Sequence, residues 1–176
     1  EIGVDVHLNT KVNRKLFDQI YKEHEVVIVA SGATEARIIE FAGWEEVIPG
    51  IEFLKAINFG PLSLTTTRFT WPADSNREVD FKGARVVGMD IAFQAWNLGA
   101  AQVSAVDIQP PASFGVERET AEAKGTKIVW PKVTERYDAK KKKIFFNDGS
   151  SMDADAVIIS IGESPVLDFL PAGMDI

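Results

Sequence analysis

The chain contains no cysteine. This absence excludes a thiol nucleophile, a redox dithiol, a thiolate zinc site and an iron–sulfur cluster built from its own residues. Histidine is also scarce, with two residues, His7 and His24, that stand far apart in the pattern. We interpret both as structural or exposed residues, so the sequence predicts no metal site.

A surplus of positive charge is also missing. The formal net charge is −7 at pH 7, whereas a nucleic-acid groove needs clustered Lys and Arg to displace counterions. The run of lysines from Lys140 to Lys143 lies between Asp138 and Asp148, and we interpret it as a solvated hairpin edge. Nucleic acid is therefore not an expected partner.

Long apolar runs are absent as well. No stretch approaches the ~20 apolar residues that a membrane helix needs, so no membrane contact is expected. The first residues, from Glu1 to Val6, do not resemble a signal peptide and instead have the pattern of a strand already under way. We expect a cytoplasmic location, and we expect further chain to precede this segment in the natural protein.

The hydrophobic pattern that is present predicts strands alternating with helices. The predicted strands are residues 4–8, 26–30, 84–87, 102–107, 127–130, 133–137, 144–146 and 156–161. The predicted helices are residues 14–23, 51–58, 89–98 and 116–124. Residues 34–80 are otherwise weakly patterned and predict a connector. Alternating strands and helices favour a parallel βαβ sheet, and the Asn147-Asp148-Gly149 turn favours an antiparallel hairpin beside it.

Two segments of the chain resemble each other. Residues 25–33 and residues 156–163 are both β-branched strands that run into a turn of small residues containing glycine. One interpretation is a duplicated domain whose two copies end in the same way. The alternative is that any two buried parallel strands look alike.

Four segments together resemble a known family. They are residues 2–12, 29–33, 53–58 and 157–163, and they occur in the family's order. The chain is similar to the FAD- and NAD(P)-dependent oxidoreductases of the glutamate synthase small-subunit type. The resemblance implies a Rossmann-like three-layer FAD/NAD(P)-binding fold of the α/β class, with a parallel sheet and an antiparallel hairpin crossover.

The resemblance implies a division of the chain and a function. Residues 1–58 would be the C-terminal part of a flavin-binding domain plus a connector helix, and residues 59–176 an NAD(P)-binding domain and return strand. The parent enzyme would pass hydride from NAD(P)H to FAD. The expected partners are the remaining flavin domain and an iron–sulfur or acceptor subunit. Since the cofactors carry the redox chemistry, no catalytic side chain is expected, and we expect this fragment alone to be inactive.

The sequence departs from the family at the phosphate-binding loop. A strand, a G-x-G-x-x-G/A turn and a helix should open the nicotinamide domain, but Val87 is followed at once by Gly88, Met89 and Asp90. Either the protein has lost this cradle or the natural protein carries residues absent from this sequence, and we favour the second. If the loop is truly absent, the alternative is a degenerate dinucleotide fold that serves as a non-catalytic structural or docking module.

The remaining candidate residues are assigned by position. Asp107 ends a predicted strand about 20 residues after the glycine turn, where an acid binds the adenosine ribose; alternatively, it only caps the strand. Ile108 and Gln109 stand where relatives that use NADPH carry two arginines, so NAD(H) is favoured over NADP(H). The loop from Gln109 to Gly115 could flank the adenine or be only a connection.

The resemblance also assigns residues outside the nucleotide strand. It gives Gly162 and Glu163 to the nicotinamide and Ser31 and Gly32 to the flavin side, and Gly88 is assigned to cofactor binding with them. Three tryptophans are interpreted as packing residues rather than base-stacking platforms: Trp71, Trp96 and Trp130.

Overall fold

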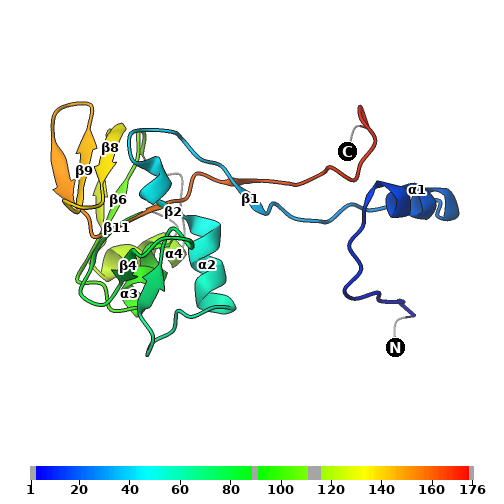
Figure 1. Cartoon of the computed structure of the whole chain (residues 1–176), viewed down its shortest axis with the longest axis horizontal. Coiled ribbons are helices and arrows are strands. Elements are labelled where there is room, and N and C mark those ends of the chain that lie inside the picture. The colour runs from blue at the N-terminus through cyan, green and yellow to red at the C-terminus, as the bar shows by residue number, and fades with distance from the viewer. Residues whose placement is uncertain (1–2, 89–90, 111–115, 175–176) are drawn as a thin grey trace. The chain divides into compact units, whose positions relative to one another are not determined.

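We describe the fold from a computed structural model, which covers residues 3–88, 91–110 and 116–174. The chain divides into a large unit, Ala36–Gly162, and a small unit made of Glu1–Glu35 and Glu163–Ile176 (Figure 1). The predicted division at residues 58 and 59 remains a prediction about the natural domains. Among the described residues, no helix is long and apolar enough to cross a bilayer.

A parallel sheet of five strands forms the centre of the large unit. In spatial order its strands are β2 (Ile48–Pro49), β11 (Ala156–Ile159), β5 (Arg85–Val87), β6 (Gln102–Val106) and β7 (Lys127–Val129). The β-branched runs that predicted β5, β6, β7 and β11 are confirmed. They suit a sheet covered on both faces, because such a sheet has no solvent side on which polar residues would alternate.

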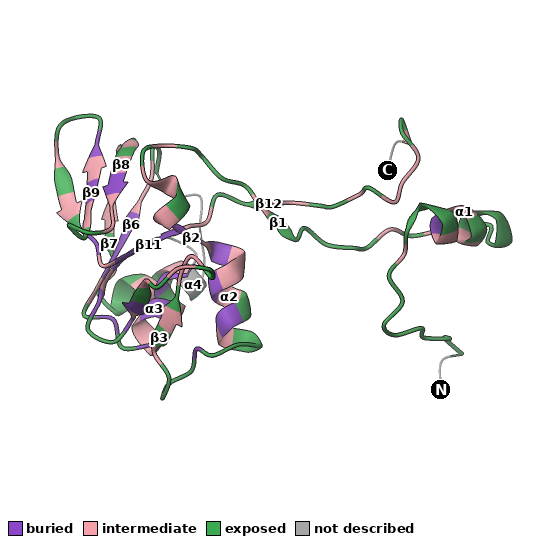
Figure 2. Cartoon of the chain, in the orientation of Figure 1, coloured by how far each residue is buried: buried purple, intermediate pink, exposed green. Residues whose placement is uncertain are grey.

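Alternate residues of the central strands enter two separate cores. Val86 and Ile158 belong to one buried cluster, whereas Val87 and Val157 belong to the other. Side chains along a strand point to opposite faces in turn, so each strand supplies both cores. The central strands β6 and β11 are coloured largely as buried in Figure 2.

Helices cover one face of the sheet. They are α2 (Gly50–Asn58), α3 (Ala92–Asn97) and α4 (Val116–Ala123), close to the predicted ranges. Phe53 of α2 and Ala95 of α3 are fully buried in the first core, together with Phe81 and Ile91. The predicted start of α3 at Met89 and Asp90 lies outside the described residues.

An antiparallel sheet covers the other face (Figure 1). Its strands are β8 (Thr134–Asp138), β9 (Lys143–Phe146) and β10 (Ser151–Asp153). Tyr137, Ile144 and Phe146 bury their side chains against the parallel sheet in the second core. The three layers confirm the predicted α/β architecture, including the hairpin after β7.

A second hairpin interrupts the predicted connector. β3 (Arg68–Thr70) pairs antiparallel with β4 (Glu78–Asp80), and Val79 is buried in the first core. The prediction of a plain loop here is therefore wrong. The strands are too short to produce a readable alternation, and their pairing depends on a cross-strand contact between Arg68 and the carboxylates of Glu78 and Asp80.

The small unit contains α1 (Arg14–Glu23), as predicted. Asn13 caps the helix, because its side-chain oxygen accepts a hydrogen bond from the Leu16 N–H at 3.0 Å. Phe17 is buried and its ring lies 5.6 Å from the ring of Phe169. The remaining short elements of the chain are β1 (Glu35–Ala36), η1 (Trp44–Glu46) and β12 (Glu163–Ser164).

The predicted strands at residues 4–8 and 26–30 are wrong, since both segments are irregular. Val6 is 71% exposed and Ile28 is 85% exposed. β-branched residues favour extended backbone, but a strand also needs a neighbour that accepts and donates its backbone hydrogen bonds. The described residues of this chain give neither segment such a neighbour.

Candidate functional site

The carboxyl-terminal edge of the parallel sheet has the geometry of a ligand site. From β5 the chain proceeds to β6 and β7 on one side, whereas β11 pairs with the other side of β5. The strand order therefore switches direction between β5 and β11. In open α/β sheets, ligands bind outside the carboxyl ends of the strands at this position.

Gly88 directly follows β5 at this edge. Its N–H donates to the Ser104 carbonyl at 2.9 Å. A Cβ atom at Gly88 would lie 2.8 Å from the Ile158 carbonyl oxygen and 2.9 Å from Ile91 Cδ1. Tight packing between β5 and β11 therefore explains the glycine, and its N–H is already used within the sheet.

Asp107 directly follows β6, the neighbour of β5. Its backbone N–H donates to the Val129 carbonyl at 3.2 Å, and its own carbonyl accepts from the Lys132 N–H at 2.8 Å. One carboxylate oxygen, Oδ1, accepts from the Gln109 N–H at 3.2 Å. The carboxylate is thus held by a turn on a rigid strand end, half-buried, while Gln109 itself is exposed.

The other predicted site residues fall in both units. Gly162 is exposed after the end of β11, with a φ of +95° that favours glycine, and its carbonyl accepts from the Arg37 N–H at 3.0 Å. Glu163, Ser31 and Gly32 belong to the small unit. The structure therefore brings Gly88, Asp107 and Gly162 to one edge of one sheet. Residues 111–115 of the predicted adenine loop lie outside the described residues.

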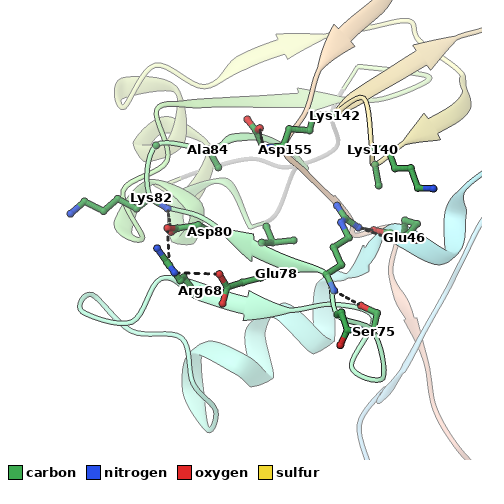
Figure 3. A pocket seen from close by; sticks show the side chains of 15 residues that line it. Glu46, Arg68, Ser75, Glu78, Asp80, Lys82, Ala84, Lys140, Lys142 and Asp155 are labelled. Atoms are coloured by element: carbon green, nitrogen blue, oxygen red, sulfur yellow. Dashed lines mark hydrogen bonds and ion pairs between the residues drawn. The ribbon is translucent and has the colours of Figure 1, made fainter.

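A cleft of about 780 Å³ opens at the opposite, amino-terminal edge (Figure 3). Gly83 and Ala84, which precede β5, and Asp155, which precedes β11, contribute to its wall. Its size is that of a ligand site, but its carboxylates are engaged by neighbouring cations. The ion pairs are Glu46 with Arg77, Glu78 and Asp80 with Arg68, and Asp155 with Arg85 and Lys142.

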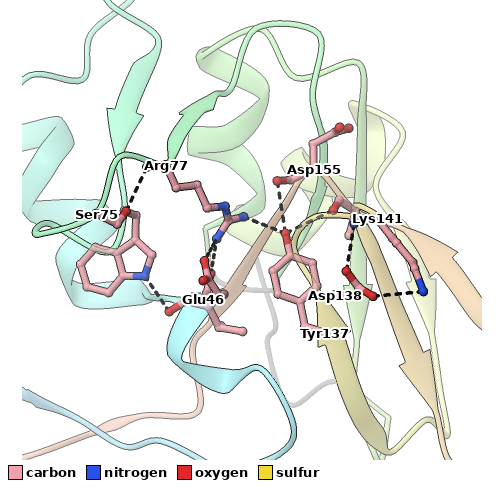
Figure 4. A network of polar contacts seen from close by, with 10 residues as sticks. Glu46, Ser75, Arg77, Tyr137, Asp138, Lys141 and Asp155 are labelled. Atoms are coloured by element: carbon pink, nitrogen blue, oxygen red, sulfur yellow. Dashed lines mark hydrogen bonds and ion pairs between the residues drawn. The ribbon is translucent and has the colours of Figure 1, made fainter.

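A polar network beside this cleft joins η1, the connection between β3 and β4, and strand β8 (Figure 4). The Arg77 guanidinium donates to the Glu46 carboxylate at 2.9 Å, to the Glu46 carbonyl at 2.7 Å and to the Tyr137 hydroxyl at 2.9 Å. Burial raises the pKa of Tyr137, against the opposing effect of Arg77. The phenol therefore stays protonated, and its hydroxyl lies 3.3 Å from the carbonyls of Ala154 and Asp155.

Asp155 ties the amino ends of β5 and β11 together. Its Oδ2 accepts from Arg85 Nε at 2.7 Å and from the Arg85 backbone N–H at 2.9 Å, and its Oδ1 accepts from the guanidinium at 3.1 Å. Lys142 Nζ lies 3.1 Å from the same Oδ1. The hydrogen bonds from the Arg85 side chain hold the pKa of Asp155 well below its usual range. This arrangement stabilises β5 and β11, the two strands between which the strand order switches.

Sequence reasoning was wrong about one tryptophan. The indole N–H of Trp71 donates to the Val47 carbonyl and that of Trp96 to the Thr126 hydroxyl, and both rings pack on the first core. Trp130 is 51% exposed, so it is not a packing residue like the other two. The strand before Trp130 could be predicted from its β-branched residues, but the exposure of Trp130 after the strand end could not.

The carboxyl edge of the sheet holds one candidate ribose-binding group, Asp107. Asp107 is the predicted acid there, and no pair of titratable side chains converges on it among the contacts of the described residues. The described residues also contain no cluster of His, Cys, Asp or Glu able to hold a metal ion.

Comparison with protein families gives one match. A model of the pyridine nucleotide-disulphide oxidoreductase family matches residues 3–176. No curated protein matches the chain.

Parts of the chain are similar to solved structures of other proteins. The thioredoxin reductase of Giardia duodenalis is 16% identical, with a TM-score of 0.51 over 79% of this chain and 44% of its own. Tmm of Pelagibacter sp. strain HTCC7211 is 30% identical over 52% of this chain and 20% of its own, with a TM-score of 0.40. The chain thus spans less than half the length of either protein.

Proposed function

The chain belongs to the pyridine nucleotide-disulphide oxidoreductase family, and on that premise we propose that it binds the adenosine end of a nicotinamide dinucleotide for a flavin oxidoreductase. FAD and a pyridine nucleotide are the cofactors of this family. When bound, the nucleotide would supply a hydride to the flavin, and the protein would bind and orient both rings. The observation that carries the proposal is the position of Asp107, at a strand end beside the switch in strand order.

The residues present fit one half of the dinucleotide better than the other. A carboxylate on the strand after the first crossover suits the two hydroxyls of the adenosine ribose, and Asp107 Oδ1 is already oriented by the Gln109 N–H. The pyrophosphate normally takes backbone N–H groups from the glycine turn. Gly88 gives its N–H to Ser104 instead, so it offers no such donor.

The residues after Asp107 support NADH over NADPH. A 2′-phosphate adds negative charge next to the ribose, where Asp107 would repel it. Ile108 and Gln109 supply no positive charge to offset that repulsion. We therefore propose a preference for NAD(H), with FAD bound by the complete enzyme.

The finer assignment is to the glutamate synthase small-subunit type. It rests on the resemblance of residues 2–12, 29–33, 53–58 and 157–163. On this proposal, residues 1–58 continue a flavin-binding domain and residues 59–176 bind the nucleotide. Ser31 and Gly32 then face the flavin, Gly162 and Glu163 contact the nicotinamide, and an iron–sulfur or acceptor subunit takes the electrons.

The test is calorimetric titration of the whole chain with NADH and with NADPH. We expect NADH to bind more tightly, and Asp107→Asn to weaken NADH by about tenfold or more, since a hydrogen bond to a charged group contributes about 1.5–3 kcal/mol. Asp74→Asn is the matched control, because it removes the same charge from an exposed loop residue. A folded chain that binds neither nucleotide at millimolar concentration would overturn the proposal.

A second function is favoured by the state of Gly88. Its packing against Ile158 and its hydrogen bond to Ser104 leave the first crossover without a free glycine N–H. This would suit a degenerate dinucleotide fold that acts as a structural or docking module. A chain of this kind would give no heat with either nucleotide. Neither nucleotide would change the unfolding temperature of the wild type or of Asp107→Asn.

A further inference from the structure

Three exposed apolar residues follow the strand ends of β6 and β7, where Asp107 lies. Ile108 is 64% exposed, Trp130 is 51% exposed and Val133 is 46% exposed. Ile108 follows Asp107 directly, and Trp130 and Val133 follow β7, the neighbouring strand. Single exposed apolar residues are normal, but a group of them around one polar side chain marks a binding surface.

The strand register brings Trp130 next to Asp107. Val106 of β6 is paired with Val129 of β7, so the next residues, Asp107 and Trp130, follow paired positions in neighbouring strands about 4.8 Å apart. Backbone hydrogen bonds from Asp107 to Val129 and from Lys132 to Asp107 tie the segment on both sides of Trp130. The sheet therefore fixes the backbone of Trp130 beside the backbone of Asp107.

Lys132 holds the far side of this segment. Its ammonium group forms an ion pair with Asp148 and donates to the Ser150 hydroxyl at 2.7 Å. The ammonium also lies 5.4 Å from the centre of the Phe146 ring. Because these contacts engage the Lys132 charge with the antiparallel sheet, it does not compensate for Asp107, and the surface around Trp130 stays acidic and apolar.

An adenosine group matches this combination. Its base is a flat ring system with two apolar faces, and its ribose carries the hydroxyls that a carboxylate accepts from. An indole face would stack on the base, and the Asp107 carboxylate would accept hydrogen bonds from the ribose hydroxyls. The two side chains follow adjacent strand ends. Stacking of a base on an aromatic side chain is sequence-tolerant and contributes substantially to binding.

We propose that Trp130 is the adenine-stacking residue of the nucleotide site, with its indole face against the base while Asp107 binds the ribose. This inference rests on the proposed function. It distinguishes Trp130 from Trp71 and Trp96, whose indole N–H groups are used inside the fold.

The experiment compares two indole-to-phenyl variants of the whole chain, W130F and W44F, with W130A as the stronger change. W44F is the matched control, since Trp44 is half-buried in η1, away from the strand ends at Asp107. NADH and reduced nicotinamide mononucleotide, which lacks the adenylate, are titrated by calorimetry. AMP is titrated against tryptophan emission.

We expect W130A to raise the Kd for NADH about fivefold or more, and W130F to raise it less because a phenyl ring still stacks. The mononucleotide should bind all variants equally, and AMP should quench emission of the wild type and W44F but not of W130F. If the wild type binds NADH and W130A binds it equally well, stacking is wrong while the proposed function stands. Equal weakening of NADH and the mononucleotide also overturns stacking, and a wild type that binds no nucleotide overturns both.

Discussion

Replacing Asp155 by asparagine tests whether the contact between the amino ends of β5 and β11 stabilises the large unit. The substitution keeps the shape of the side chain and removes its charge. It weakens the forked hydrogen bonds from Arg85, at 2.7 and 3.1 Å, and the contact with Lys142 at 3.1 Å. Hydrogen bonds to charged groups contribute about 1.5–3 kcal/mol each in net terms.

The expected cost follows from the burial of the pair. The Asp155 side chain is 18% exposed and that of Arg85 is 35% exposed, so water screens the interaction in part. An asparagine oxygen also still accepts one hydrogen bond. We therefore take the lower part of the range, about 2 kcal/mol in the free energy of unfolding.

Asp153→Asn is the matched control. Asp153 Oδ2 lies 2.9 Å from the same Arg85 guanidinium, but its side chain is 53% exposed. Exposed ion pairs contribute about 0.2–1 kcal/mol, so this variant should lose less than half as much. The comparison holds the residue type, the charge change and the Arg85 partner constant. It varies burial and the second contacts, which are Lys142 and the Arg85 backbone N–H for Asp155 and Lys143 for Asp153.

Urea unfolding followed by tryptophan emission provides the assay. All four tryptophans, Trp44, Trp71, Trp96 and Trp130, lie in the large unit, so the signal reports that unit alone. With a slope of about 2 kcal/mol/M, the Asp155→Asn midpoint should fall by about 1 M. Equal shifts in the two variants would refute the argument, because burial would then not decide the strength of the contact.

Three further predictions use the same assay. Hydrogen bonds from Arg85 lower the pKa of Asp155, so the contribution of the Asp155 carboxylate to the free energy of unfolding is complete above the unfolded pKa of about 4 and is lost as the pH falls below it. From pH 5 to pH 3 the wild type should therefore lose more stability than Asp155→Asn. Gly88→Ala should cost about 1–3 kcal/mol, since its Cβ would lie 2.8 Å from the Ile158 carbonyl oxygen; an unchanged midpoint would contradict this. Tyr137→Phe should cost about 1–3 kcal/mol by removing the hydroxyl that accepts from Arg77 at 2.9 Å, and a midpoint equal to that of the wild type would show that the hydroxyl contact is not needed.

The central strands were predictable because their sequence determines burial directly. β5, β7 and β11 contain adjacent β-branched residues, and β6 contains valines with small residues between them, and a sheet covered on both faces selects such patterns. The same pattern failed at residues 26–30, where Ile28 is 85% exposed. Local preference for extended backbone is common to both cases, and only the parallel sheet supplies a pairing neighbour.

The short polar strands were not predictable. β10 reads Ser151-Met152-Asp153 and becomes a strand because β9 pairs with it. β2 contains two residues and exists because Ile158 and Ile159 of β11 lie beside it. Such elements depend on partners far away in the chain, which a local pattern does not contain.

The candidate site was predictable in part for the same reason. Asp107 could be placed at a strand end from the pattern that precedes it. The contact of Arg85 with Asp155 joins residues 70 positions apart, and the exposure of Trp130 depends on what packs over the end of β7. Neither has a local signal, so the structure was needed to find them.

The two edges of the parallel sheet differ in how their polar groups are used, and this difference favours the carboxyl edge as the proposed site. At the amino edge the cleft is large, but Glu46, Glu78, Asp80 and Asp155 all have cationic partners within the fold. A ligand there would have to displace ion pairs. At the carboxyl edge the described residues give the Asp107 carboxylate one hydrogen bond, from a backbone N–H, and Trp130 lies exposed beside it. Capacity for a ligand therefore remains at the carboxyl edge, where the Asp107 carboxylate has one hydrogen bond among the described residues and the exposed Trp130 follows the neighbouring strand.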